Sequence, residues 1–112
     1  EAQKVVIARA LAQQSDVLLF DEPTSNLDLK NQLEVISIIK KIVRERQISA
    51  VVTMHDLNLA LRFADKFILM KGGEIFAVGD IGVITVENIL AVYGVSVEIE
   101  RHRGIPVVIP VA

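Results

Sequence analysis

The sequence predicts an α/β fold, in which mainly parallel strands with flanking helices are followed by β-hairpins. Two apolar runs, 17–20 and 49–54, lie on either side of a segment whose apolar residues recur at helical spacing. This strand–helix–strand order is typical of a parallel sheet covered by helices. Further along, a Gly-Gly pair at 72–73 separates two more apolar runs, which predicts an antiparallel hairpin. At 112 residues the chain is at most one domain with a modest core.

The stretch 17–28 joins an apolar run to two acids, a proline and a polar turn, in the order Val-Leu-Leu-Phe-Asp-Glu-Pro-Thr-Ser-Asn-Leu-Asp. Four apolar residues without polar alternation predict a strand buried on both faces. Pro23 is expected to end the strand because it has no N–H to donate. Ligands of open α/β sheets bind beyond the carboxyl ends of the strands, so Asp21 and Glu22 are candidates for a site. Taken alone, the same pattern also suits an ordinary strand that ends in a solvated turn.

Capping residues and apolar spacing assign the other elements. Asp28, Asp56 and Thr85 are suited to cap the N-termini of helices, and Gly94 is placed to end one in the left-handed region. Proline keeps the last strand at an edge. The expected helices are 1–13, 29–46, 57–64 and 85–93, and the expected strands beyond the first two are 67–70, 75–78, 95–100 and 105–111.

The composition excludes several classes of protein. The chain is 52% hydrophobic, which is too apolar for a disordered segment. A formal net charge of −2 gives no global basic field, so nucleic acid is not an expected partner. The absence of cysteine excludes disulfides and thiolate metal sites. No apolar run approaches the roughly 18 residues of a membrane span, and no signal-peptide layout is visible, so we expect a soluble chain unless it docks on a membrane component.

Basic residues gather in the last turns of the helix expected at 29–46, at Lys40, Lys41, Arg44 and Arg46. Their charge suits the negative end of the helix macrodipole. A nucleic-acid patch is the alternative interpretation, and a solvated helix end is the favoured one.

A histidine follows the second apolar run. Parallel strands joined by a crossover helix carry their polar ends to the same edge of the sheet, which brings His55 towards Asp21 and Glu22. Considered alone, His55 is more simply explained as a satisfied loop residue, and the neighbouring acids favour a functional role. His102 has no such company and is expected in a surface turn.

Three segments together resemble a known family. Residues 17–23 resemble the Walker B strand of ATP-binding-cassette (ABC) ATPases, 25–28 resemble their D-loop, and 54–56 resemble their switch-histidine loop. Residues 3–11 resemble the helix that follows the family's Leu-Ser-Gly-Gly-Gln signature. The run 55–60, the Gly-Gly hairpin and residues 92–95 are most similar to the ATPase subunits of importers for iron chelates, haem or cobalamin.

The resemblance implies a partial P-loop NTPase fold with ATP and Mg²⁺ as cofactors. Asp21, which matches the Walker B aspartate, would hold Mg²⁺, and Glu22, which matches the catalytic glutamate, would orient the attacking water. His55 would hydrogen-bond the γ-phosphate. Ser25 and Asp28 would lie at the interface with a second copy, where the family forms its composite nucleotide sites.

Two family motifs are not found in these 112 residues: the G-x-x-x-x-G-K-S/T phosphate loop and the Leu-Ser-Gly-Gly signature. We therefore expect the carboxy-terminal portion of a longer subunit, with 1–79 as part of the ATPase core and 80–112 as an extension. The isolated portion is expected to be inactive and to self-associate through exposed sheet edges and faces. The complete subunit is expected on the cytoplasmic side of the cell membrane, bound to permease subunits. A soluble ABC-type ATPase that acts on DNA or translation and a non-catalytic regulatory module are the alternatives.

Overall fold

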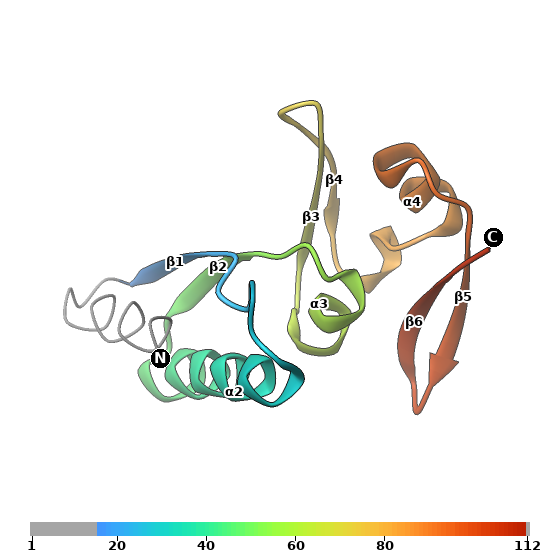
Figure 1. Cartoon of the computed structure of the whole chain (residues 1–112). Coiled ribbons are helices and arrows are strands. Elements are labelled where there is room, and N and C mark those ends of the chain that lie inside the picture. The colour runs from blue at the N-terminus through green and yellow to red at the C-terminus, as the bar shows by residue number, and fades with distance from the viewer. Residues whose placement is uncertain (1–15, 112) are drawn as a thin grey trace. The chain divides into compact units, whose positions relative to one another are not determined.

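The structure, a computed structural model, describes residues 16–111 (Figure 1). The chain divides into two compact units, with the division between His55 and Asp56. The helix expected at 1–13 lies outside the described residues. The boundary expected after Gly79 remains a prediction.

The first unit contains β1 (Val17–Asp21), α2 (Leu29–Arg46) and β2 (Ser49–Thr53). The second unit contains α3 (Leu57–Phe63), β3 (Phe67–Lys71), β4 (Glu74–Gly79), the 3₁₀ turn η1 (Ile81–Val83), α4 (Val86–Tyr93), β5 (Val97–His102) and β6 (Ile105–Pro110).

The first unit is a parallel strand pair with a helix packed against it (Figure 1). β1 and β2 pair in parallel, with Val17 opposite Ser49 and Asp21 opposite Thr53. The predicted strand–helix–strand order is therefore confirmed. The core of this unit lies between the strand pair and the helix, and its buried members are Leu18, Phe20, Val35 and Ile39.

The expectation that the first strand is buried on both faces is wrong for this chain. Leu18 and Phe20 are buried, but the alternating residue Leu19 is 71% exposed. On the paired strand, Val51 is 44% exposed. Alternate side chains of a strand point to opposite faces, and among the described residues α2 covers one face of the pair. The continuous apolar run therefore leaves one apolar face open to solvent.

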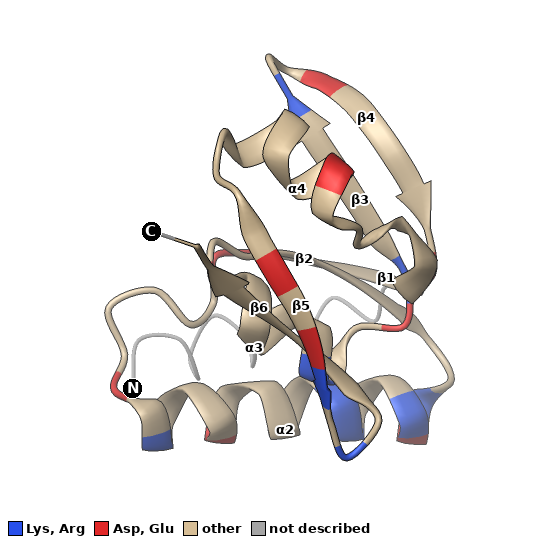
Figure 2. Cartoon of the chain, turned by 90° about the vertical axis from the view of Figure 1, so that its right-hand side faces the viewer, with Lys and Arg blue, Asp and Glu red and all other residues tan. Residues whose placement is uncertain are grey.

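Helix α2 begins and ends where its sequence predicts. The Oδ1 atom of Asp28 accepts a hydrogen bond from the backbone N–H of Asn31 at 2.8 Å, which caps the first turn. At the other end Gln47 takes the left-handed conformation, with φ of 54°, and its N–H donates to the Val43 carbonyl. Figure 2 shows basic residues concentrated towards the last turns of this helix, where Arg44 and Arg46 are exposed to solvent, as expected for a solvated helix end.

The second unit packs two helices and two antiparallel hairpins around its own core. Gly72 and Gly73 both have positive φ and connect β3 to β4, so the predicted hairpin is confirmed. Helix α4 is capped by Thr85 and ended by Gly94, also as predicted. The buried core residues are Leu61, Phe67, Leu69, Ile84, Ile89, Val97 and Val108.

The last hairpin differs from its prediction. The strand expected at 95–100 begins at Val97 and continues to His102, which pairs with Ile105. The turn is therefore formed by Arg103 and Gly104 alone, with φ of 54° and 79°. A two-residue turn with positive φ at both positions matches the twist of the strands, so strand pairing extends beyond the end that the polar residues predict.

Within residues 16–111, none of the helices has both the length and the apolar character that are needed to span a membrane.

Candidate active site

The two acids lie at the carboxyl end of β1, as the sequence predicts. Asp21 is the last residue of the strand, and Glu22 follows it with φ of 48°, a left-handed conformation that is uncommon for residues other than glycine. Pro23 and Thr24 are buried directly after it. The chain therefore leaves the strand through a packed turn, which fixes the backbone positions from which the two acidic side chains extend.

Thr53, the last residue of β2, contacts both acidic residues. Its hydroxyl donates to Oδ1 of Asp21 at 2.6 Å. The backbone N–H of Glu22 donates to the same hydroxyl oxygen at 2.8 Å and to the Thr53 carbonyl at 3.1 Å. Thr53 is not among the site residues that the sequence predicts. The signal that was available is its place at the end of the second strand, two residues before His55, where parallel pairing sets it opposite Asp21.

The structure also brings His55 to the acids. The Nε2 atom of His55 contacts Oε1 of Glu22, and an N–H at this nitrogen would donate to the carboxylate. The His55 side chain is 87% exposed and the Glu22 side chain 38% exposed, so both are open to a ligand. Asp21, Glu22 and His55 thus form one cluster, in which Thr53 links the first two.

Ser25 and Asp28 occupy the turn that follows the acids. The backbone N–H of Ser25 donates to the Glu22 carbonyl at 3.1 Å. The carboxylate of Asp28 caps α2 through Oδ1. Both residues are exposed, and within residues 16–111 the structure shows no side-chain contact between either of them and the acid–histidine cluster. Their predicted place at an interface with a second copy stays a prediction.

The donor set suits a metal ion that is held mainly by water and a ligand. Within the described part of the chain, no group of three or more His, Cys, Asp or Glu side chains is placed to hold a metal by itself. Asp21 uses one carboxylate oxygen for the Thr53 hydroxyl, and no hydrogen bond from a described residue reaches the other. Mg²⁺ keeps several of its waters and takes one or two carboxylates plus substrate phosphates. The residues present therefore fit Mg²⁺ that arrives with a nucleotide.

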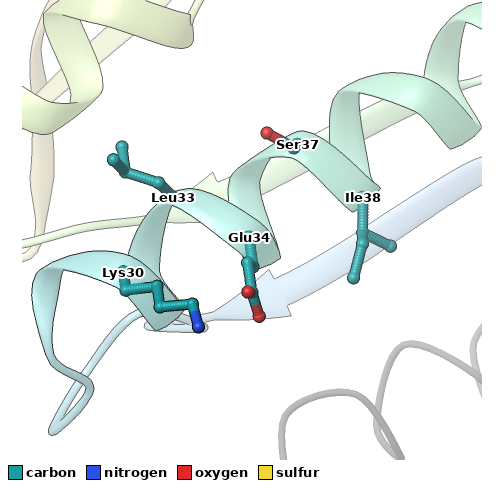
Figure 3. Close-up of a pocket in the computed structure, with 5 residues that line it drawn as sticks. All are labelled: Lys30, Leu33, Glu34, Ser37 and Ile38. Carbon is teal, nitrogen blue, oxygen red and sulfur yellow. The ribbon is translucent and has the colours of Figure 1, made fainter.

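A pocket lies elsewhere in the first unit, on the side of α2 (Figure 3). The described residues that line it are Lys30, Leu33, Glu34, Ser37 and Ile38, all from one helix. None of them belongs to the acid–histidine cluster, so this pocket is not the candidate active site.

Comparison with known proteins gives the family. No protein-family model matches the sequence. The uncharacterized ABC transporter ATP-binding protein MJ0089 of Methanocaldococcus jannaschii is 61% identical over 99% of this chain and 44% of its own length. A structure of an ABC transporter described as of the metal-chelate type, in an inward-facing conformation, matches 98% of this chain and 46% of that chain, with a TM-score of 0.85 and 28% identity. The chain belongs to the ATP-binding proteins of ABC transporters.

Other ABC proteins support this assignment. The hemin import ATP-binding protein HmuV of Rhizobium johnstonii is 40% identical over 90% of this chain and 41% of its own length. A dimeric structure of the ATP-binding cassette MJ0796, bound to ADP and Pi, matches 70% of this chain and 33% of that chain, with a TM-score of 0.62 and 38% identity. The chain thus spans less than half the length of these ABC relatives. The resemblance of 17–28 and 54–56 to ABC motifs is in agreement with membership of this family.

Proposed function

We propose that this chain is the carboxy-terminal part of the ATP-hydrolysing subunit of an ABC importer for iron chelates, haem or cobalamin. The observation that carries the proposal is the cluster at the strand ends, where Glu22 contacts His55 and Thr53 ties Asp21 to Glu22. The likeness to a hemin import protein and to a metal-chelate type transporter supports the substrate class.

The roles of the cluster residues follow from their geometry and charge. When bound with ATP, Mg²⁺ neutralises phosphate charge in the transition state. Asp21 offers the carboxylate oxygen that would hold this ion through its water shell. Glu22 orients and polarises the attacking water as a general base. His55 donates a hydrogen bond to a γ-phosphate oxygen as negative charge shifts there.

The contact between His55 and Glu22 supports these roles because it shows the reach of both side chains. Each side chain is exposed, and each extends far enough to touch the other. A γ-phosphate and its attacking water placed between the two would meet a donor on one side and a carboxylate on the other. We propose that nucleotide binding replaces the direct contact with this arrangement.

The D-loop residues are proposed to act on a second copy of the subunit. Ser25 and Asp28 are exposed on the turn that leaves the cluster. The dimer of the related MJ0796 cassette supports a dimeric assembly. We further propose permease subunits as partners, and a location on the cytoplasmic face of the membrane through them.

The 112 residues alone are proposed to bind ATP weakly or not at all and not to hydrolyse it. The printed sequence has no phosphate loop, whose backbone N–H groups and lysine grip the phosphates in this class of enzyme. Calorimetric titration of the 112-residue chain with Mg-ATP measures this directly. Micromolar affinity would contradict the proposal.

Hydrolysis by the full-length subunit tests the main proposal. In the full-length protein, Glu22→Gln should lower the rate of ATP hydrolysis by about 10²- to 10⁴-fold, the usual contribution of a positioned general base. Glu98→Gln, on an exposed strand position of the second unit, is the matched control and should keep the wild-type rate. A wild-type subunit without Mg-dependent hydrolysis would overturn the proposal. Co-purification with nucleic acid rather than with a permease would favour the alternative of a soluble ABC-type ATPase.

A further inference from the structure

Thr53 joins the two acidic residues of the candidate site through one hydroxyl group. The geometry points to Thr53 as a positioning residue of the proposed ATP site, one that directs the Asp21 carboxylate and holds the backbone of Glu22. This inference rests on the proposed function. Thr53 is distinct from the three cluster residues to which the proposed function gives a role, Asp21, Glu22 and His55.

The direction of the two hydrogen bonds is fixed by chemistry. A hydroxyl group has one proton to donate and lone pairs to accept with, whereas the backbone N–H of Glu22 can only donate. The Thr53 oxygen must therefore accept from Glu22, at 2.8 Å, and its proton is left for Oδ1 of Asp21, at 2.6 Å. A short bond to a carboxylate is charge-assisted and strongly directional. The Asp21 carboxylate is thus held by one oxygen, with the other oxygen left to face a ligand.

The backbone of Glu22 needs such support. Its φ of 48° lies in the left-handed region, which side chains other than glycine adopt rarely. Glu22 also precedes Pro23, and residues before proline favour extended backbone. A conformation of this kind persists when its surroundings hold it. The Glu22 N–H is held by both the hydroxyl and the carbonyl oxygen of Thr53, so this threonine fixes the backbone from which the Glu22 side chain reaches His55.

The position of Thr53 permits a clean substitution. Thr53 is exposed to solvent at the end of β2. Valine has nearly the same shape and is favoured in strands, but it has no hydroxyl group. Thr53→Val therefore removes both side-chain hydrogen bonds and leaves the strand intact. Thr53→Ser keeps the hydroxyl. Ser49→Val is the control, because it replaces a hydroxyl on the same face of the same strand for which the structure shows no side-chain hydrogen bond among residues 16–111.

The experiment compares these three variants in the full-length subunit. Thr53→Val should lower kcat for ATP hydrolysis by about threefold to tenfold, the factor that corresponds to the net contribution of a single hydrogen bond. It should raise the Mg²⁺ concentration for half-maximal rate by a similar factor. The KM for ATP should stay within about twofold, since both hydrogen bonds of the Thr53 hydroxyl are made to Asp21 and Glu22. Thr53→Ser and Ser49→Val should match the wild type. A general weakening of the fold would not lower kcat and raise the Mg²⁺ requirement while it left the KM for ATP unchanged.

A second measurement does not depend on activity. In the nucleotide-free subunit, hydrogen exchange of the Glu22 amide, followed by NMR, should be about threefold to tenfold faster in Thr53→Val and unchanged in the other two variants. Wild-type kcat, Mg²⁺ requirement and Glu22 exchange in Thr53→Val would overturn the inference while the proposed function stands. A wild-type subunit that hydrolyses no ATP would overturn the proposed function, and the positioning role at an ATP site with it. The amide exchange would then still show whether Thr53 holds the Glu22 backbone.

Discussion

The Nε2 atom of His55 contacts Oε1 of Glu22, although one residue follows β2 and the other follows β1. Parallel pairing of these strands, with Asp21 opposite Thr53, carries both residues to the same edge. The contact is therefore a product of strand order and register. It joins two side chains for which the ABC family resemblance predicts complementary roles, a water-orienting carboxylate and a phosphate-binding imidazole.

The first prediction concerns His55. In the full-length subunit, His55→Ala should lower the rate of ATP hydrolysis by about tenfold or more, because a donor to the developing phosphate charge is lost. ATP binding should change much less, since the side chain is exposed and shapes no core. His102→Ala is the matched control, because His102 lies at the end of a surface strand. Equal rates for His55→Ala and wild type, measured as phosphate release, would show that His55 has no part in hydrolysis.

The second prediction separates two roles of Asp28. Its carboxylate caps α2 by accepting from the Asn31 N–H. Asp28→Ala should lower the free energy of unfolding by about 1 kcal/mol, whereas Asp28→Asn should leave it nearly unchanged because asparagine caps equally well. Urea denaturation measures both values. If Asp28 also acts at an interface through its charge, both variants should slow hydrolysis by the full-length dimer. Wild-type rates in both would leave Asp28 as a capping residue alone.

The third prediction concerns Asn58, which ties α3 to β6 in the second unit. Its side-chain Nδ2 donates to the Val108 carbonyl at 3.1 Å, and its Oδ1 accepts from the Val108 N–H at 2.8 Å. Asn58→Ala leaves both part-buried backbone groups without these partners, so the free energy of unfolding should fall by about 1–3 kcal/mol.

A graded variant sharpens this test. Asn58→Asp keeps the acceptor for the Val108 N–H and loses the donor, so its denaturation midpoint should lie between Asn58→Ala and the wild type. Glu100→Gln, at an exposed position of β5, should not shift the midpoint. If the denaturation midpoint of Asn58→Ala equalled that of the wild type, this pair of hydrogen bonds would add no net stability.

The fourth prediction concerns the exposed apolar face of β1 and β2. We expect the 112-residue chain to self-associate, because Leu19 is 71% exposed beside Val51 on the paired strand. Light scattering should give a mass that rises with concentration. Leu19→Lys should shift the chain towards monomer, whereas Leu29→Lys, at a 68% exposed position on α2, should not. A monomer mass at every concentration in the wild-type chain would contradict the prediction.

Local signals in the sequence were sufficient for most individual elements. Asp28, Thr85 and Gly94 mark helix ends because their side chains or backbone freedom act within one turn. The Gly72–Gly73 hairpin was predictable for the same reason. The turn at Arg103–Gly104 was less predictable from the sequence. The polar residues beside it extend the strands because they pair across the hairpin, and not because of a local preference.

By itself, the sequence determined the order of the strands, the helix between them, and the acids and histidine that follow the strands. Parallel pairing then made their proximity predictable. Only the tertiary structure decided the burial of β1 and the role of Thr53. Burial depends on which layers cover each face of a strand, and an apolar run does not specify its partners. The Thr53 hydrogen bonds depend on the register Asp21–Thr53 and on the left-handed backbone of Glu22, which arise from contacts between residues distant along the chain.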